Sequence, residues 1–399
     1  NYVEEGIPYL TTKNISDQGL DLSKLTFITK ETHEKILSKS RVYPGDIIYN
    51  KSGNVGLSAI LTQQYKEYNL VSDLIYIRPD VDKVNPYYLV LFLNSSVGKK
   101  LSEQQAGGSI FQHISIYDVQ DLKIALPVME IQQYIGNKVR KAEELRERAK
   151  ENRREYTSLI DNYFSNVSKD KFPKGSFIIN CQNIDSKSQR LDASFYNPIY
   201  KEYENLDIEY KKLGDLVKAK TNINPKSDVD YFYYEIGDMS NNVILDKEET
   251  IKGKNLPSRA KLNLSKYDII VSLVQESIEV TSFVDIDREN MLTTNGCAVL
   301  APKDISIAGY LYAIVSSPYF IAQKCRYISG TNIRSLSKED LLQIPIPIFE
   351  YKIIEKINDL VKDEYYSLRL AKQLIREAKQ DVEDLIEGKF DESKISEGV

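Results

Sequence analysis

The sequence predicts a mixed α/β (α+β) fold in which one unit occurs twice and each copy ends in a long helix. The passages Gly108–Pro127 and Gly330–Pro347 share one order of features: a glycine followed by Ser or Thr, an acidic amphipathic stretch, and an alternating apolar run that ends at proline. A charged, helical pattern follows each passage at once. The length of 399 residues also exceeds one ordinary core, so two or more domains are expected.

The repeat extends towards the N-terminus through further pairs of similar segments, which lie about 220 residues apart. Gly45–Ile48 (GDII) matches Tyr267–Ile270 (YDII), and both predict the start of a β-branched strand. Two more pairs keep the same order: Ile7–Ile15 with Phe232–Ser240, and the short apolar helices Asn85–Ser95 with Ile307–Ser317. We therefore expect a duplicated unit.

Short apolar runs between turn residues predict the strands of each copy. The expected strands are Asp46–Tyr49, Leu74–Ile77 and Leu122–Leu126 in the first copy, and Ile269–Leu273, Ala298–Leu300 and Leu342–Ile346 in the second. Short helices should connect them. The Ser-, Lys- and Pro-containing segment Phe164–Phe177 is typical of a connector between the copies.

Apolar residues follow a heptad pattern in both long helices. The predicted seams are Ala142, Leu145, Ala149, Asn152, Tyr156, Leu159 and Tyr163 in the first, and Ile357, Val361, Glu364, Leu368, Ala371, Ile375, Ala378, Val382 and Leu385 in the second. A helix of about 35 residues is roughly 50 Å long. Neither helix could bury so long an apolar stripe against its own small domain, so the two helices should pair with each other. Asn152 and Glu364 interrupt the seams; they either fix the register or lie at a solvated edge.

Composition limits the class of protein. No run of 18 apolar residues is present, so no membrane span is expected. Three widely spaced cysteines, Cys181, Cys297 and Cys325, argue against a disulfide framework and favour a reducing cytoplasm. Because the net charge is −5, a nucleic-acid-binding surface must be a local patch.

Catalytic motifs are not found in the sequence. No GxxxxGK[ST] phosphate loop occurs, and His33 and His113 lack the spacing of zinc ligands. Asn85–Tyr88 (NPYY) is similar to a methyltransferase signature but lacks its second proline and a preceding glycine-rich loop, so it is interpreted as a helix start. We expect no catalytic residue, no metal and no cofactor bound by this chain.

Together these features resemble the specificity (S) subunit of type I restriction–modification systems. Besides the repeated passages and the GDII/YDII pair, Leu126–Ile135 looks like the family's proline-then-glutamine lead into a spacer helix, and Lys212–Leu216 looks like the start of a target-recognition domain. Two departures are present. Ile344–Ile354 lacks the glutamine, and the first copy lacks its own LGDL, which predicts that some tens of residues precede Asn1.

The resemblance implies two target-recognition domains separated by two antiparallel coiled-coil spacer helices, with approximate two-fold symmetry. The implied domains are residues 1–129, spacer helix 130–166, residues 167–348, spacer helix 349–388 and a tail of residues 389–399. Each domain would read one half of a bipartite double-stranded DNA target. Two methyltransferase (M) subunits would dock on the chain and carry the S-adenosylmethionine, and restriction (R) subunits would be a further, optional partner.

Three polar loops in each copy have the chemistry to contact base edges or phosphates. In the first copy the residues are Thr12, Lys13, Asn14, Lys51, Ser52, Asn54, Ser109, Gln112 and His113. In the second copy they are Ser272, Gln275, Glu276, Thr294, Asn295, Thr331, Asn332 and Arg334. The alternative for each residue is a solvated loop without a ligand.

Two other functions compete with this interpretation. The chain is alternatively the DNA-recognition portion of a fused methyltransferase–nuclease, which residues before Asn1 would reveal. It is otherwise a structural protein whose coiled coil joins two domains that do not bind DNA. Salt-dependent DNA binding separates this structural protein from the DNA-reading subunit.

Overall fold

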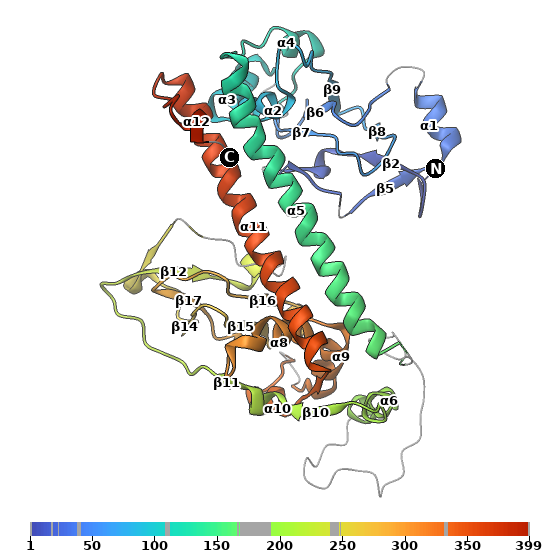
Figure 1. The fold of residues 1–399 in the computed structure, drawn as a ribbon, viewed down its shortest axis with the longest axis vertical. Coiled ribbons are helices and arrows are strands. Elements are labelled where there is room, and N and C mark those ends of the chain that lie inside the picture. Colours follow the sequence, from blue (N-terminus) through green and yellow to red (C-terminus); the bar gives the residue numbers. More distant parts are fainter. Residues whose placement is uncertain are drawn as a thin grey trace, which may run out of the picture. The chain divides into compact units, whose positions relative to one another are not determined.

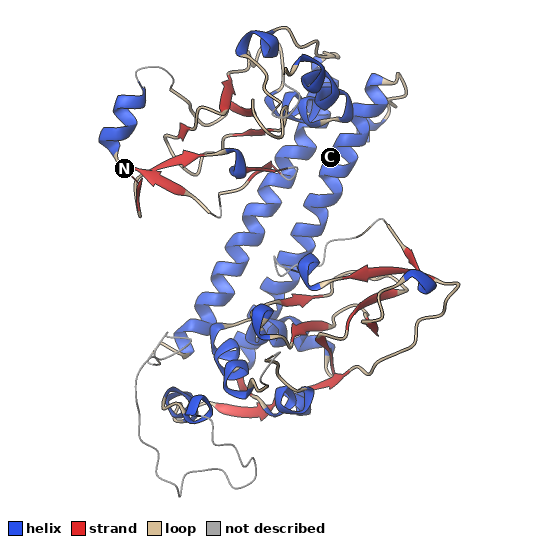
Figure 2. Ribbon diagram, turned by 180° about the vertical axis from the view of Figure 1, so that it is seen from behind, coloured by secondary structure: helices blue, strands red, loops and turns tan. Residues whose placement is uncertain are grey.

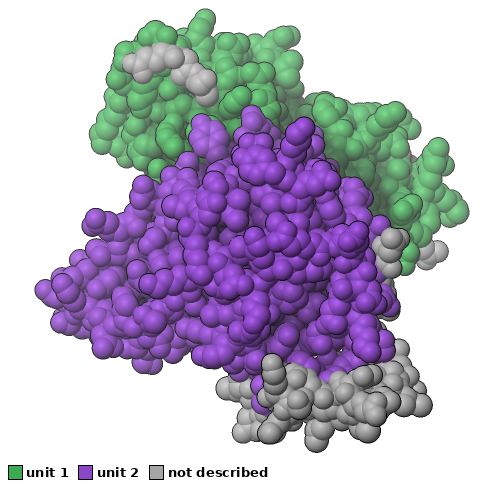
Figure 3. Space-filling model, turned by 60° about the horizontal axis from the view of Figure 1, so that its bottom comes forward, with its two compact units in different colours: residues 1–145, 370–399 green, residues 146–369 purple. Residues whose placement is uncertain are grey.

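The computed structural model describes residues 2–16, 19–22, 24–37, 41–107, 112–165, 167, 193–239, 247, 249–330 and 334–397. Two compact units divide the chain (Figure 3). Unit 1 consists of residues 1–145 and 370–399, and unit 2 of residues 146–369. The long helices α5 (Met129–Tyr163) and α11 (Tyr351–Ile386) therefore each contribute one end to unit 1 and the other end to unit 2.

Unit 1 contains two main sheets (Figure 1). One has the order β1–β5–β2–β8, formed by Tyr2–Val3, Thr26–Ile28, Ile7–Leu10 and Asn69–Leu70. The other has the order β7–β6–β9, formed by Ser58–Ile60, Ile47–Asn50 and Leu74–Ile77. A small ribbon, β3–β4, pairs Ile15–Ser16 with Gly19–Leu20. Besides one end each of α5 and α11, the helices of unit 1 are α1 (Lys30–Leu37), α2 (Pro86–Asn94), α3 (Ser96–Gln105), α4 (Ile116–Gln120) and α12 (Lys394–Glu397).

Unit 2 contains two sheets of the same kind (Figure 2). The order β13–β12–β17–β14 joins Ile251–Lys252, Asp230–Tyr234, Met291–Thr294 and Ala260–Asn263. The order β11–β18–β15–β16 joins Val217–Ala219, Cys297–Pro302, Ile269–Ser272 and Thr281–Phe283. A two-stranded ribbon pairs β10 (Glu209–Lys212) with β19 (Pro345–Ile348). The helices are α6 (Ile199–Glu204), α7 (Leu213–Leu216), α8 (Ala308–Val315), α9 (Pro318–Tyr327) and α10 (Lys338–Gln343).

Strand pairing confirms the duplicated mixed α/β unit. In unit 1, β2 lies between antiparallel β5 and parallel β8; in unit 2, β12 lies between antiparallel β13 and parallel β17. Likewise β6 pairs antiparallel with β7 and β9, as β15 does with β16 and β18. Each unit then continues into a pair of short helices whose second member is capped by a serine, Ser95 for α3 and Ser317 for α9.

Most strands lie where the apolar runs predict them, but the expected strand Leu122–Leu126 is wrong. These residues form no strand, and Leu126 is 58% exposed. Its counterpart in unit 2 becomes β19 because β10 supplies four paired residues, and Ile346 there is fully buried. Within the described residues, unit 1 has no strand in the position of β10. The predicted strand Leu342–Ile346 also begins too early, because Leu342 still belongs to helix α10, which ends at Gln343.

The core of unit 2 surrounds α8 and α9, whose apolar side chains are almost all buried. Gly309 allows α8 to approach α11 closely, since a Cβ atom there would lie 2.8 Å from the Asn358 carbonyl oxygen. Among the described residues no single helix is long and apolar enough to cross a membrane. Among the helices that the structure describes, one bent pair, Ile305–Val315 and Pro318–Tyr327 at 72°, has the length and hydropathy of a span when the two are taken together.

Within unit 1, the first part of α5 packs against the last part of α11. The seam residues Ala142, Leu145, Ala378 and Val382 share one apolar cluster. Lys138 crosses this contact and donates from Nζ to Asp381 Oδ2 at 2.6 Å, and both side chains are almost fully buried. Lys394 of α12 donates to the other Asp381 oxygen at 2.9 Å.

Within unit 2, the last part of α5 packs against the first part of α11, with the chains antiparallel. Arg148 makes two 2.6 Å hydrogen bonds to Asp363, and Asn152 donates to Asp363 Oδ2 at 2.6 Å. Arg153 pairs with Glu364 at 2.6 Å, and Glu364 is buried. The sequence left two positions open for Glu364, inside the seam or at a solvated edge. Its burial favours a position inside the seam.

Candidate nucleic-acid interface

Two predicted loops of unit 1 lie side by side. Lys51, which follows β6, accepts a hydrogen bond on its carbonyl oxygen from Ile114 N at 3.0 Å. The adjacent Ser52 hydroxyl lies 3.0 Å from His113 Nδ1. His113 in turn exchanges two main-chain hydrogen bonds with Gly107, at 2.9 and 3.0 Å. The loops after β6 and before α4 therefore form one surface. Residues 71–73 join it through the hydrogen bond from Lys51 N to Asp73 O. We call this surface loop cluster 1 (residues 50–54, 71–73, 107 and 112–113).

The equivalent loops of unit 2 are joined by equivalent bonds. Gln275 N donates to Arg334 O at 3.0 Å, and Leu336 N donates to Leu273 O at 2.8 Å. Leu273 N donates to Gly296 O at 3.1 Å and so attaches the loop after β17. All three predicted loops of the second copy thus meet. We call this surface loop cluster 2 (residues 272–277, 294–296 and 334–335).

Each copy also contains one loop that the sequence analysis missed. In unit 1, Lys51 N donates to Asp73 O at 3.0 Å, which places residues 71–73 where residues 294–296 lie in unit 2. In unit 2, the chain after β12 forms a 3₁₀ turn, Ile236–Met239, in the place of the turn Thr12–Asn14 after β2. Both missed loops could have been found from the sequence, because each lies at the position that the repeat assigns to a loop predicted in the other copy.

Exposure separates the predicted residues into groups. Exposed side chains belong to Lys13, Asn54, Gln112, His113, Gln275, Glu276, Asn295 and Arg334. Thr12, Lys51 and Ser52 are half-buried. Asn14, Ser272 and Thr294 are buried. Ser109, Thr331 and Asn332 lie outside the described residues. The exposed group offers amide, imidazole and guanidinium donors, which is the chemistry that base edges and phosphates require.

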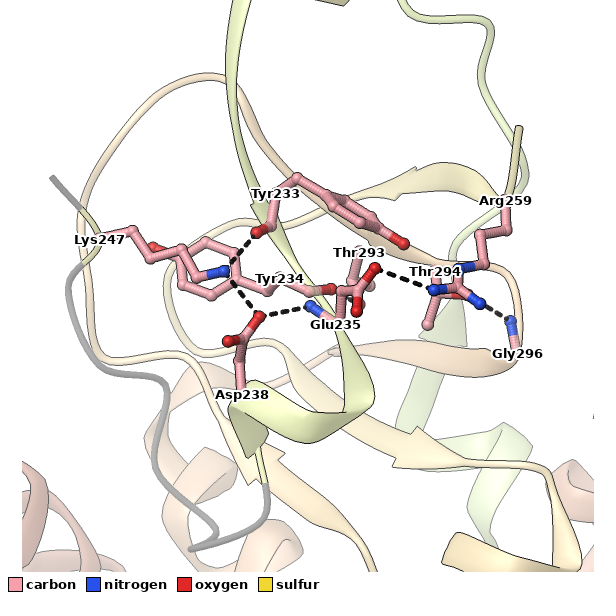
Figure 4. A network of polar contacts seen from close by, with 9 residues as sticks. All are labelled: Tyr233, Tyr234, Glu235, Asp238, Lys247, Arg259, Thr293, Thr294 and Gly296. Atoms are coloured by element: carbon pink, nitrogen blue, oxygen red, sulfur yellow. Dashed lines mark hydrogen bonds and ion pairs between the residues drawn. The ribbon is translucent and has the colours of Figure 1, made fainter. Parts of the chain in front are cut away.

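The three buried side chains hold the loops in shape. Asn14 accepts from Thr11 N at 2.9 Å and donates to Asp21 O at 3.0 Å. Ser272 shares a 2.7 Å hydrogen bond with Ser277, which closes the loop after β15. Thr294 Oγ1 accepts from Gly296 N at 3.2 Å (Figure 4). That these three contact DNA stays a prediction; their visible partners are the loops themselves.

Lys324 supports loop cluster 2 from inside the unit. Its Nζ atom donates to the carbonyl oxygen of Ile278, at the end of the loop after β15. The ammonium group is fully buried, and burial lowers the pKa of Lys324 to about 8, although Cys325, Glu279 and Cys297 oppose the shift. A fully buried lysine therefore anchors this loop through its hydrogen bond to Ile278.

Metal-binding geometry is not present among the residues that the structure describes, since no group of three His, Cys, Asp or Glu side chains is placed to hold an ion. The two histidines have other contacts: His33 is buried and lies 3.2 Å from Asn69 Nδ2, and His113 contacts Ser52. The buried thiol of Cys297 has a pKa raised by burial to about 12, which leaves it protonated and unreactive at neutral pH.

The fold and its two loop clusters define a duplicated mixed α/β protein. A family model for the type I restriction modification DNA specificity domain matches residues 1–155 and 205–380. The matched segments make up most of the chain, and the chain belongs to this family. The expected resemblance is thereby confirmed, and a family of specificity domains agrees with the expectation of a non-catalytic chain.

The individual proteins to which the chain is similar have low sequence identity to it. The chain is 28% identical over 135 residues to a protein named as the type I restriction enzyme MjaX specificity subunit of Methanocaldococcus jannaschii. The match covers 33% of this chain and spans about a third, 32%, of that curated relative. Among solved structures, the S subunit from M. genitalium is 16% identical, with 98% of this chain and 90% of that chain covered and a TM-score of 0.47. The HsdS subunit from Thermoanaerobacter tengcongensis is 15% identical, with 98% of this chain and 91% of that chain covered and a TM-score of 0.31.

Proposed function

We propose that this chain is the DNA-reading subunit of a type I restriction–modification complex and that each unit reads one half of a bipartite target. The observation that carries the proposal is the duplication of the loop cluster. The hydrogen bond from Ile114 N to Lys51 O has its counterpart in the bond from Leu336 N to Leu273 O. Since the framework is retained while the exposed side chains differ, the two clusters suit two different half-sites.

The two long helices have the length and chemistry of a spacer between the readers. They have 35 and 36 residues, and in each unit they pack antiparallel along a heptad seam. At 1.5 Å per residue each is about 50 Å long, and two readers on one face of DNA are about 34 Å, one helical turn, apart. We propose an antiparallel coiled coil that sets the gap between half-sites and gives approximate two-fold symmetry.

Catalysis belongs to partners in this proposal. Two methyltransferase subunits dock on the chain and carry S-adenosylmethionine, and restriction subunits join the complex in the cytoplasm. The proposal rests on family membership and on the lack of cofactor motifs in the sequence. The purified chain, incubated with labelled S-adenosylmethionine and DNA, should transfer no label. Transfer by the chain alone would contradict the assignment of methylation to the partner.

The direct test is methylation by the reconstituted complex of this chain with its methyltransferase subunits on a randomised DNA library. The expected product is a split motif: two short specified segments with an unspecified gap of constant length. A single continuous motif, or methylation without sequence preference, would contradict the proposed function. Binding measured in parallel should weaken steeply with salt, because phosphate contacts release counterions.

A further inference from the structure

A turn at the edge of loop cluster 2 is fixed by a network of polar contacts (Figure 4). After β12, Glu235 N donates to Asp238 Oδ2 at 2.7 Å. Lys247 Nζ donates to the same Asp238 oxygen at 2.7 Å and to Tyr233 O at 2.8 Å. Asp238 N also donates to Glu235 O at 3.0 Å. The main chain of Glu235 is thus held on both sides, which fixes the backbone from which its carboxylate extends.

The Glu235 carboxylate holds Arg259, which precedes β14. Arg259 Nη2 donates to Glu235 Oε1 at 2.9 Å. The carbonyl oxygen of Arg259 also accepts a 2.8 Å hydrogen bond from Asn295 N, in the loop after β17. Two independent contacts therefore place this arginine against loop cluster 2, beside a residue that the sequence predicts to contact DNA.

The side chain of Arg259 remains available to a ligand. It is 58% exposed, and the hydrogen bond to Glu235 uses one of its five N–H donors. Glu235, with a contribution from Tyr233, raises the pKa of the Arg259 guanidinium, so the group is charged at every physiological pH. The result is an exposed, charged fork of donors whose position is set before any ligand binds.

The neighbouring carboxylate selects the kind of ligand. Glu235 lies within hydrogen-bond distance of the guanidinium and would repel a phosphate group at the same place. A guanine edge presents two neutral acceptors, N7 and O6, which fit the arginine fork without that repulsion. We propose that Arg259 is a specificity-determining residue that reads a guanine in the half-site of unit 2, and that Glu235 is its positioning residue. This inference rests on the proposed function.

The test uses the reconstituted methyltransferase complex and the randomised library, with variants Arg259→Ala, Arg259→Lys and Glu235→Gln. Arg259→Ala should reduce the preference for guanine at one position of the unit 2 half-site by about 5- to 150-fold, the value of one bidentate base contact. Arg259→Lys keeps the positive charge but loses the planar, bidentate guanidinium. Its preference for guanine should therefore be only slightly higher than that of Arg259→Ala. Glu235→Gln should give a smaller loss at the same position, with an unchanged thermal midpoint.

Lys303→Ala is the matched control. Lys303 is an exposed cation that follows β18, at the opposite end of that strand from residues 294–296, and it donates to Gly214 O and Asp215 O. The control should leave the motif unchanged. If Arg259→Ala fails to fold, Arg259→Lys carries the test.

Three outcomes would overturn the inference. An unchanged motif in Arg259→Ala, beside a split motif in the wild type, would refute it and leave the proposed function standing. Equal weakening at all positions would show a phosphate contact in place of base reading. A wild-type complex without a split motif would refute the proposed function itself, and this inference with it.

Discussion

At the scale of single residues, a buried carboxylate shapes the same turn in both units. Asp46 accepts from Tyr43 N at 2.8 Å, and Asp268 accepts from Ser265 N at 2.7 Å. The cation that neutralises each one comes from a different part of each unit. Arg78 of unit 1 bonds Asp46 at 2.7 Å, and Lys220 of unit 2 bonds Asp268 at 2.6 Å. The aspartates are predictable from the GDII and YDII motifs, whereas their partners depend on tertiary packing.

Lys324 makes the stability of unit 2 depend on pH. Its pKa in the folded chain is about 8, below the usual 10.5, so the unfolded chain binds more protons between these values. The free energy of unfolding should therefore rise from pH 8 to pH 10, by roughly 1–3 kcal/mol. Urea unfolding at several pH values measures it. Lys324→Met should abolish the rise, and an equal rise in that variant would assign the effect to other groups.

At the scale of elements, the buried ion pairs of the long helices should matter more than the exposed ones. Arg153→Met leaves Glu364 buried without its partner and should lower the free energy of unfolding by about 3–5 kcal/mol. The double variant Arg153→Met, Glu364→Leu should recover much of this loss, since both charges are gone.

The matched control for that prediction is Arg148→Ala, in the same helix. Arg148 is 60% exposed and pairs with Asp363, so its loss should cost about 0–1 kcal/mol. Denaturant midpoints of the full chain compare the variants. If Arg153→Met were no more destabilising than Arg148→Ala, burial of the Arg153–Glu364 pair would not be the reason for its contribution.

The elements also show where sequence patterns suffice. Heptad positions such as Ala142 and Val361 are buried as predicted, because a helical seam follows from local periodicity alone. The segment Leu122–Leu126 has the apolar alternation of a strand but pairs with none among the described residues, because pairing is a property of two segments. The buried Asn14, Ser272 and Thr294 show a similar limit. A polar side chain in a loop predicts a contact without saying whether the partner is a ligand or the loop's own backbone.

At the scale of the whole molecule, the helices should set distance while the loops set chemistry. Removing one heptad from each helix, residues 142–148 and 367–373, keeps the Lys138–Asp381 and Arg153–Glu364 pairs. The spacer becomes shorter by about 10 Å, equal to about three base-pair steps. Methylation of the randomised library by this complex should show both half-site sequences unchanged and a shorter gap. Altered half-site sequences with the original gap would contradict the spacer role.

The central claim is that each unit reads one half-site. Its most direct test compares two pairs of substitutions in the reconstituted complex. Lys51→Ala with Gln112→Ala changes loop cluster 1, and Gln275→Ala with Arg334→Ala changes loop cluster 2. The measurement is the methylation motif of each complex on the randomised library. We expect the first pair to weaken or relax recognition of one half-site only, and the second pair that of the other half-site, by about 1–3 kcal/mol for each lost bidentate base contact. If either pair altered both half-sites equally, the assignment of one unit to one half-site would be wrong.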